Sequence, residues 1–259
     1  MDYKYLIVEV EEGVALVTIN RPKALNAINR ELMLEIQKVF KEDLTKREIH
    51  GAIITGAGEK AFVAGADIKG FMDFSPEEAS KLSREGHETY NAIEDFHRPV
   101  IAAVNGFALG GGCELAMACH MRVAEENARF GQPEVNLGLI PGYAGTQRLP
   151  QLIGIAKATE LLLTGDMINA EESLALGLVN HVVEKGQSVI KAKEIIGKVA
   201  TKAPLAIEET LRCLRAFQSK TEDGYELEID RFGWCFGTED FKEGTSAFLE
   251  KRKPEFKNK

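Results

Sequence analysis

The stretch VIAAVNGFALGGGCE, residues 100–114, joins an apolar run, a turn signal and a glycine cluster. Its first part, Val100 to Val104, is unbroken and apolar, which is typical of a strand that is buried on both faces of a sheet. Asn105-Gly106 turns the chain, and the three glycines that follow are expected to open a helix near Cys113. A buried strand followed closely by a helix predicts an α/β fold with crossover connections.

Strand and helix signals also alternate upstream of this stretch. β-branched residues predict a strand over Val14 to Asn20, and a short apolar strand is expected over Ala52 to Thr55. Between these strands, apolar residues recur at helical spacing, at Leu32, Ile36, Val39 and Phe40. The alternation therefore extends the α/β pattern toward the N-terminus.

A capped helix is predicted to begin after Ser75. The Ser75 hydroxyl can accept a hydrogen bond from the first-turn amides, and Glu78 completes a capping box. Pro76 suits the first helical position because that position needs no amide donor. We expect this helix to run to about Phe96, where Pro99 interrupts the pattern.

The chain is expected to consist of an α/β core over residues 1–200 and a helical module over residues 201–259. Helical periodicity dominates from Thr146 onward, with one more strand over Leu178 to Val183, and only helices are predicted after about Ala203. The large apolar side chains of the module are too many for a free surface and must bury on the core or on another subunit: Phe217, Leu227, Phe232, Trp234, Phe236, Phe241 and Phe248. Burial between subunits is favoured, which predicts an oligomer.

Composition excludes several classes of protein. The chain has 259 residues, of which 44% are hydrophobic and 28% charged, and these proportions are those of a globular protein rather than a disordered or fibrous one. A formal net charge of −8 disfavours nucleic acid and anionic membranes as partners. The sequence has neither an apolar run long enough to span a bilayer nor an apolar signal core at its N-terminus, so a cytoplasmic location is expected. The four cysteines and five histidines lack the close spacing of metal ligands, so no metal site is expected.

The glycine cluster is the first candidate for chemistry. Glycines between a buried strand and a helix allow the backbone to approach a ligand and point free amides at it. The partial positive charge at a helix start suits an oxyanion or a phosphate. The alternative is a tight turn that only packs strand against helix.

Two carboxylates accompany the glycine-rich turns. Glu114 lies two residues after the last glycine of the cluster, in the first helical turn, where an acidic residue usually serves as a solvated partner of the helix dipole. Glu134 lies in Phe130-Gly131-Gln132-Pro133-Glu134, a loop between apolar segments. Two carboxylates around one glycine-lined site are what acid and base catalysis on a neutral substrate requires. Spacing alone does not show whether the two converge.

A third segment, Ala64-Gly65-Ala66-Asp67-Ile68-Lys69, again contains small residues that allow close backbone approach. The Ala66 amide is a candidate hydrogen-bond donor. The alternative is a simple transition from loop to helix with Asp67 as the N-cap.

Other catalytic motifs are absent or incomplete. Gly56 to Ala61 roughly matches a dinucleotide-binding loop, but no long helix is predicted after it. No phosphate-binding loop occurs, and no serine lies in a nucleophile elbow. Cys113 has no histidine beside it in sequence, which favours a buried structural thiol over a nucleophile.

These segments together resemble the crotonase superfamily, and within it the enoyl-CoA hydratases. The resemblance is an ordered series that spans nearly the whole chain: Asn20 to Ala27, Ala64 to Lys69, Pro99 to Glu114, Phe130 to Glu134, Ile140 to Leu149, Thr164 to Asp166, Ala175 to Val179 and Ser246 to Arg252. It implies a spiral of ββα units with a C-terminal helical module that builds trimers, often stacked as hexamers.

The resemblance also implies roles for particular residues. The backbone amides of Ala66 and Gly111 match the oxyanion hole around the thioester carbonyl, and Glu114 and Glu134 match the two catalytic glutamates. The residue matching Glu114 activates water, and the one matching Glu134 handles the proton at C2. Relatives that isomerise, decarboxylate or hydrolyse CoA esters commonly lack one of the two, so the intact pair favours hydration.

An acyl-CoA thioester is the implied substrate, and no cofactor beyond its CoA carrier is implied. The matching contact positions in one subunit are Ala64, Ala66, Asp67, Ile68, Gly111 and Gly142. Phe248 and Lys251 match positions that reach the CoA of a neighbouring subunit, and a lysine suits its phosphates.

The sequence departs from the family pattern at two positions, and two other functions stay open. Ala144 stands where relatives often have glycine, and His120 stands where an aspartate is frequent. Both are interpreted as local packing changes. The first alternative function is an enoyl-CoA isomerase or another CoA lyase of the superfamily. The second is a non-enzymatic RNA-binding or scaffolding protein, against which the net charge and the glutamate pair weigh.

Overall fold

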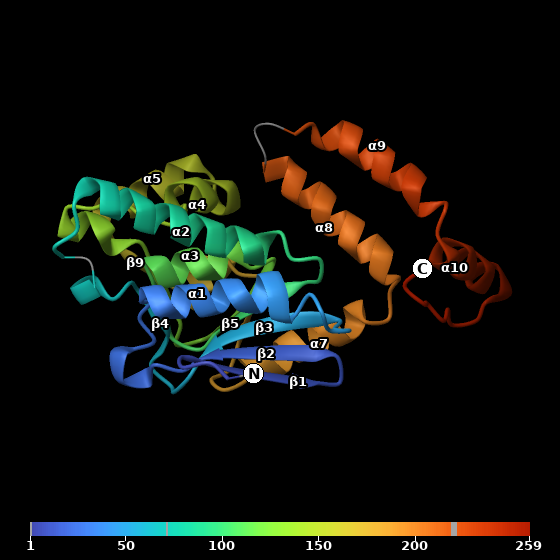
Figure 1. Ribbon diagram of the computed structural model, residues 1–259, viewed down its shortest axis with the longest axis horizontal. Coiled ribbons are helices and arrows are strands. Elements are labelled where there is room, and N and C mark those ends of the chain that lie inside the picture. Colours follow the sequence, from blue (N-terminus) through green and yellow to red (C-terminus); the bar gives the residue numbers. More distant parts are fainter. Residues whose placement is uncertain (1, 71, 219–221) are drawn as a thin grey trace.

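The larger of two sheets organises the N-terminal part of the molecule (Figure 1). The computed structural model describes residues 2–70, 72–218 and 222–259. Six strands lie side by side in the order β1 (Leu6–Glu11), β2 (Val14–Ile19), β3 (Gly51–Gly56), β5 (Val100–Val104), β7 (Met121–Glu125) and β10 (His181–Val183). β1 is antiparallel to β2, and every other pair is parallel.

The smaller sheet carries the loops of the site. Its four strands follow the order β4 (Ala61–Ala64), β6 (Phe107–Leu109), β8 (Arg129–Gly131) and β9 (Met167–Asn169). The first three are parallel, and β9 is antiparallel to β8. Three strands of this sheet have only three residues, too few to show a period of two in the sequence.

The chain alternates between the two sheets as it advances. β3 in the large sheet leads to β4 in the small one and then to α2 (Pro76–Glu94). β5 and β6 lead in the same way to α3 (Gly111–Ala118), and β7 and β8 lead to the 3₁₀ helix η4 (Pro133–Leu137). Each turn places its strands beside those of the previous turn, so the expected spiral of ββα units is confirmed.

The central strands of the large sheet are buried on both faces. One face packs in the main core together with α1 (Arg30–Lys38), α2 and α3, whose eight residues are all buried. The other face is covered by α7 (Ser188–Val199), where Ile196 packs with Ile53 and Ile101. This two-sided burial is what the unbroken apolar run of β5 predicts.

The sequence places most of the long elements correctly. The predicted capping box at Ser75 is present, and α2 ends at Glu94, two residues before the expected end, because Asp95 leaves the helical conformation. The predicted strand over Leu178 to Val183 begins only at His181, because the amides of Leu178 and Val179 both donate to Ser173 O. The helices predicted from Thr146 onward include α4 (Gly145–Ile153), α5 (Ile155–Thr164) and α6 (Ala170–Ala175), and a π-helical turn η2 (Val39–Asp43) follows α1.

The C-terminal helices extend away from the core (Figure 1). α8 (Pro204–Gln218) and α9 (Gly224–Cys235) lie side by side, and α10 (Glu239–Glu250) lies beyond them. Large apolar side chains of this region do not bury on the core of the same chain, since Phe217 is 85% and Phe248 83% exposed. Phe232, Trp234 and Phe236 are exposed as well. In the described part of the chain, no helix combines the length and the apolar character needed to cross a bilayer.

Candidate active site

The parallel register of the small sheet brings three distant motifs to one edge. Ala64 at the end of β4 pairs with Leu109 at the end of β6, and Leu109 pairs with Gly131 at the end of β8. Ala66 and Gly111 each lie two residues beyond these paired positions, so the pairing brings their amides to the same edge. Glu134 lies three residues beyond Gly131 and completes the convergence that sequence spacing alone does not show.

The Ala66 and Gly111 amides are available to a ligand. The residues on either side of Ala66 form backbone hydrogen bonds with Ile28. The Ile28 amide donates to Gly65 O, and the Asp67 amide donates to Ile28 O. Within the described residues, the Ala66 and Gly111 amides themselves have no protein acceptor. The Tyr90 hydroxyl donates to Gly111 O at 2.7 Å and thereby fixes the orientation of the glycine turn.

These amides lie at a cavity of about 280 Å³ that the carboxylates also line. Among the described residues, all those that line it lie in the core, between positions 64 and 143. Its polar groups include the amides of Ala66 and Gly111 and the carboxylates of Glu114 and Glu134, and Ser83 and Tyr143 also line it. The rest of the wall is mainly apolar and includes Ile68, Leu82, Leu109, Leu137, Leu139 and Ile140. A small apolar pocket with a few converging polar groups is typical of an enzyme site.

Glu114 is a buried carboxylate held by backbone amides. Its Oε1 accepts hydrogen bonds from Tyr143 N at 2.8 Å and from Gly145 N at 2.7 Å. Burial raises the pKa of Glu114 to about 7, although the Gly145 amide opposes the rise. Glu134 raises this pKa further, while the Tyr143 amide and Arg148 lower it. A carboxyl group with a pKa near neutrality can both accept and donate a proton at physiological pH.

The backbone of the loop before α4 makes this contact possible. Ala144 has φ +75°, a left-handed conformation that costs a residue with a Cβ about 1–2 kcal/mol. Its neighbour has to be glycine, because a Cβ on Gly145 would lie 2.8 Å from Pro141 Cβ and 3.0 Å from Glu114 Oε1. The departure at Ala144 is therefore more than a packing change, since glycine adopts this conformation without strain.

Glu134 faces the cavity from η4 and is partly buried, which raises its pKa. The side-chain amide of the buried Gln132 satisfies its hydrogen bonds when its nitrogen faces Glu134. In this orientation the nitrogen lies 3.1 Å from Glu134 Oε1 and 3.2 Å from Glu134 Oε2. Gly110 leaves room for the carboxylate, because a Cβ there would lie 2.7 Å from Glu134 Oε1. Gln132 therefore orients Glu134, and nothing in its sequence context distinguishes it from any loop glutamine.

The predicted contact positions divide into two groups. Ala64, Ile68 and Gly142 line the cavity together with the amides and carboxylates. Asp67 lines a neighbouring cavity instead, and its carboxylate accepts a hydrogen bond from Arg21 Nη2 at 2.9 Å.

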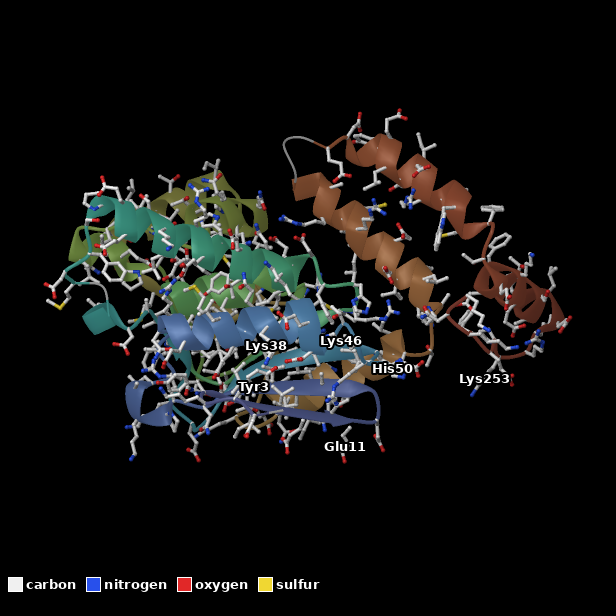
Figure 2. All side chains as sticks on the ribbon, in the orientation of Figure 1. Tyr3, Glu11, Lys38, Lys46, His50 and Lys253 are labelled. Atoms are coloured by element: carbon white, nitrogen blue, oxygen red, sulfur yellow. The ribbon has the colours of Figure 1, made fainter. Side chains whose placement is uncertain are left out.

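Phe248 and Lys251 lie outside the cavity of their own chain. Both are exposed at the end of α10, which projects from the far side of the helical module (Figure 1). Lys253 follows these residues in the chain and is labelled in Figure 2, where it lies well away from the strands and α2.

Cys113 and His120 have structural roles. Burial raises the pKa of Cys113 to about 12, as expected for a structural thiol. His120 Nδ1 accepts from Val100 N at 2.9 Å, and its Nε2 lies 3.1 Å from Glu94 O, so both ring nitrogens are occupied. Strand β4 follows the glycine-rich turn after Gly56, where a dinucleotide-binding loop would lead into a helix.

Comparison with known proteins gives consistent matches along the whole chain. Residues 9–259 match the model of the enoyl-CoA hydratase/isomerase family. The chain is 47% identical over 260 residues to a crotonyl-CoA hydratase of Syntrophomonas wolfei and 48% identical over 261 residues to a short-chain-enoyl-CoA hydratase of Clostridium acetobutylicum, in each case over 100% of both chains. The crystal structure of an enoyl-CoA hydratase from Bacillus anthracis superposes with a TM-score of 0.93 at 37% identity, covering 99% of this chain and 100% of the other.

Proposed function

Because the chain belongs to the enoyl-CoA hydratase/isomerase family, we propose that it is a hydro-lyase that reversibly adds water to short-chain 2-enoyl-CoA thioesters. The product is the corresponding 3-hydroxyacyl-CoA. One observation carries the proposal: two carboxylates with raised pKa values line the same small cavity as two backbone amides that have no acceptor among the described residues.

The two amides stabilise the charge that develops in the reaction. When water adds at C3 of the enoyl thioester, electron density moves to the carbonyl oxygen. The amides of Ala66 and Gly111 donate to that oxygen, and their backbone positions are fixed before the substrate arrives. The loss of one such donor typically lowers kcat about 10²–10³-fold.

The two glutamates handle the protons. Glu114 accepts a proton from water while the water oxygen bonds to C3. Glu134 delivers a proton to C2. Each proton transfer contributes about 10²–10⁴-fold to the rate. An isomerase moves a proton between two carbons and has no water to activate, so the pair of carboxylates favours hydration over isomerisation.

The size of the cavity supports a short acyl chain. Its volume of about 280 Å³ lies just below the range for ligand pockets, which is roughly 300–1,000 Å³. The apolar side chains of its wall suit a hydrocarbon tail, while the carboxylates and amides lie where the thioester and its double bond react.

We also propose that the chain assembles into a homo-oligomer, either a trimer or a dimer of trimers. The exposed aromatic side chains of α8 to α10 support it, because a second copy of the chain would remove them from water. In such an assembly Phe248 and Lys251 would reach the CoA bound by a neighbour, while Asp67 would contact CoA near its pairing with Arg21. The reaction needs no cofactor beyond the CoA carried by the substrate.

The proposal is tested with the purified chain and crotonyl-CoA. Hydration removes the conjugated double bond, so ultraviolet absorbance falls and the product mass rises by one water. We expect Glu134→Gln to lower kcat by at least about 10²-fold with the fold intact. Glu126→Gln is a matched control, because Glu126 is exposed in the turn between β7 and β8 and should leave kcat unchanged. Clean wild-type protein that adds no water would contradict the proposal.

A further inference from the structure

A buried ion pair lies directly behind the loop that holds Glu114. Arg148 on α4 is 5% exposed, and its Nη2 lies 2.8 Å from Glu94 Oε2 on α2. The same nitrogen donates to Asn91 Oδ1 at 3.0 Å. A buried guanidinium loses its hydration, and partners on a neighbouring helix compensate for that loss.

The other end of the guanidinium reaches the loop itself. Arg148 Nη1 donates to Tyr143 O at 2.9 Å, while Tyr143 N donates to Glu114 Oε1. The next carbonyl, that of Ala144, accepts from the Arg148 backbone amide at 2.8 Å. Arg148 therefore holds the peptide unit between Tyr143 and Ala144 through its guanidinium, and the unit that supplies the Gly145 amide through its own backbone amide, even though Ala144 is in a strained conformation. The unit that supplies the Tyr143 amide is held by Ser83, whose hydroxyl donates to Gly142 O at 2.6 Å.

We propose that Arg148, fixed by Glu94, is the positioning residue for Glu114, and that it acts by holding the Tyr143 to Gly145 loop so that both amides point at the carboxylate. The inference rests on the proposed function for its catalytic meaning. It goes beyond that function because Arg148 does not line the cavity and contacts no reacting atom.

The same ion pair joins the site to the C-terminal helices. Arg215 on α8 lies 3.2 Å from Glu94 Oε2 through its Nη1 and 2.8 Å from Asp95 Oδ1 through its Nε. A series of contacts therefore leads from α8 through Glu94 and Arg148 to Tyr143, whose amide binds Glu114.

The charges around Glu114 fix the sign of the expected effect. Arg148 lowers the pKa of Glu114, and Glu134 from η4 raises it. The other titratable neighbours are Tyr90 on α2, Tyr143 on the loop and Cys113 on α3, and burial raises the pKa of each, which keeps them neutral. Removal of the guanidinium therefore takes away a cation and frees the Tyr143 carbonyl, which lies between the two amide donors. Both changes should raise the pKa of Glu114.

The test is a titration of the Glu114 carboxyl group by carbon-13 NMR without substrate, with the signal assigned by its absence in Glu114→Gln. In Arg148→Gln the midpoint should rise by about one pKa unit, and Arg148→Lys should restore part of the difference. In turnover with crotonyl-CoA, Arg148→Gln should lower kcat at least about tenfold with KM nearly unchanged, because the carboxylate is misplaced rather than lost.

Arg122→Gln is the matched control. Arg122 is also buried, but its guanidinium donates to the carbonyls of Leu178, Cys119 and Ala116, so its loss should lower stability without moving the Glu114 midpoint. If Arg148→Gln does not fold, the double variant Glu94→Gln with Arg148→Gln leaves no uncompensated buried charge on this pair and should show the same rise. An unchanged midpoint in a folded variant would overturn the proposal. The titration needs no substrate, so it tests the role of Arg148 even if the wild-type protein hydrates nothing. Failure to hydrate would overturn only the proposed function.

Discussion

Replacement of Glu114 by glutamine should make the protein more stable at neutral and alkaline pH. The carboxyl group has a pKa of about 7 in the folded chain, against an ordinary value of 4.5. Below pH 4.5 the group is protonated in both the folded and the unfolded chain, and its burial has no pH-dependent cost. Above pH 7 the folded chain must hold a buried charge that the unfolded chain exposes to water, so the free energy of unfolding falls as the pH rises between these values.

The size of the effect follows from the two pKa values. The rise of the pKa from 4.5 to about 7 corresponds to about 3 kcal/mol, since each pKa unit is worth 1.36 kcal/mol. Glutamine has nearly the same shape, and its Oε1 can accept both amides that now bind Glu114 Oε1. Between pH 5 and pH 8 the variant should therefore gain about 2–3 kcal/mol of unfolding free energy relative to wild type.

Urea unfolding followed by far-ultraviolet circular dichroism measures this difference. Wild type and Glu114→Gln are compared at one fixed protein concentration over that pH range, because association would also change the apparent stability. The contribution of Glu134, whose pKa is also raised, is present in both proteins and largely cancels in the comparison. Glu126→Gln provides the control, because this exposed carboxylate should give a difference that does not depend on pH.

A difference between Glu114→Gln and wild type that stays constant from pH 5 to pH 8 would refute the reasoning. It would mean that Glu114 has the same proton affinity in the folded and unfolded chains. A difference that falls as the pH rises would be still more damaging, because it would mean that the folded chain stabilises the charged form.

Three further substitutions probe the geometry of the site. Gly110→Ala should lower kcat by about tenfold or more with an unchanged circular dichroism spectrum, because the new methyl would lie 2.7 Å from Glu134 Oε1; wild-type kcat would contradict this. Ala144→Gly should raise the free energy of unfolding by up to about 1 kcal/mol in urea titrations, because it removes left-handed strain at φ +75°; lower stability would contradict this. Lys251→Ala should raise KM for crotonyl-CoA about tenfold with kcat retained, by loss of a phosphate contact, whereas Lys253→Ala should change KM little; equal effects would argue against a specific role.

The long elements of the fold could be predicted because each has a local cause. The unbroken apolar run marks β5, the β-branched residues mark β2, and the capping box at Ser75 marks the start of α2. The three-residue strands β6, β8 and β9 could not be predicted, since they are too short to show a periodic pattern. Their pairing is nevertheless what determines which loops meet.

The site could be predicted only in part for the same reason. Glu114 and Glu134 are conspicuous because carboxylates beside glycine-rich turns suggest chemistry, but their convergence depends on the register of the small sheet. The donors to Glu114 are backbone amides, which every residue except proline carries, so no residue type identifies Tyr143 and Gly145. Arg148 reads in the sequence as an ordinary charged residue of a helix, and only tertiary packing buries it against Glu94.

The most direct test of the proposed mechanism uses crotonyl-CoA in water enriched in heavy oxygen. The mass and the rate of formation of the product are measured for wild type and for Glu134→Gln. The structure predicts that wild type rapidly forms 3-hydroxybutyryl-CoA with one heavy oxygen at C3, and that Glu134→Gln forms the same product at least about 10²-fold more slowly. Equal rates for the two proteins, or unlabelled isomer in place of the hydroxy product, would contradict it.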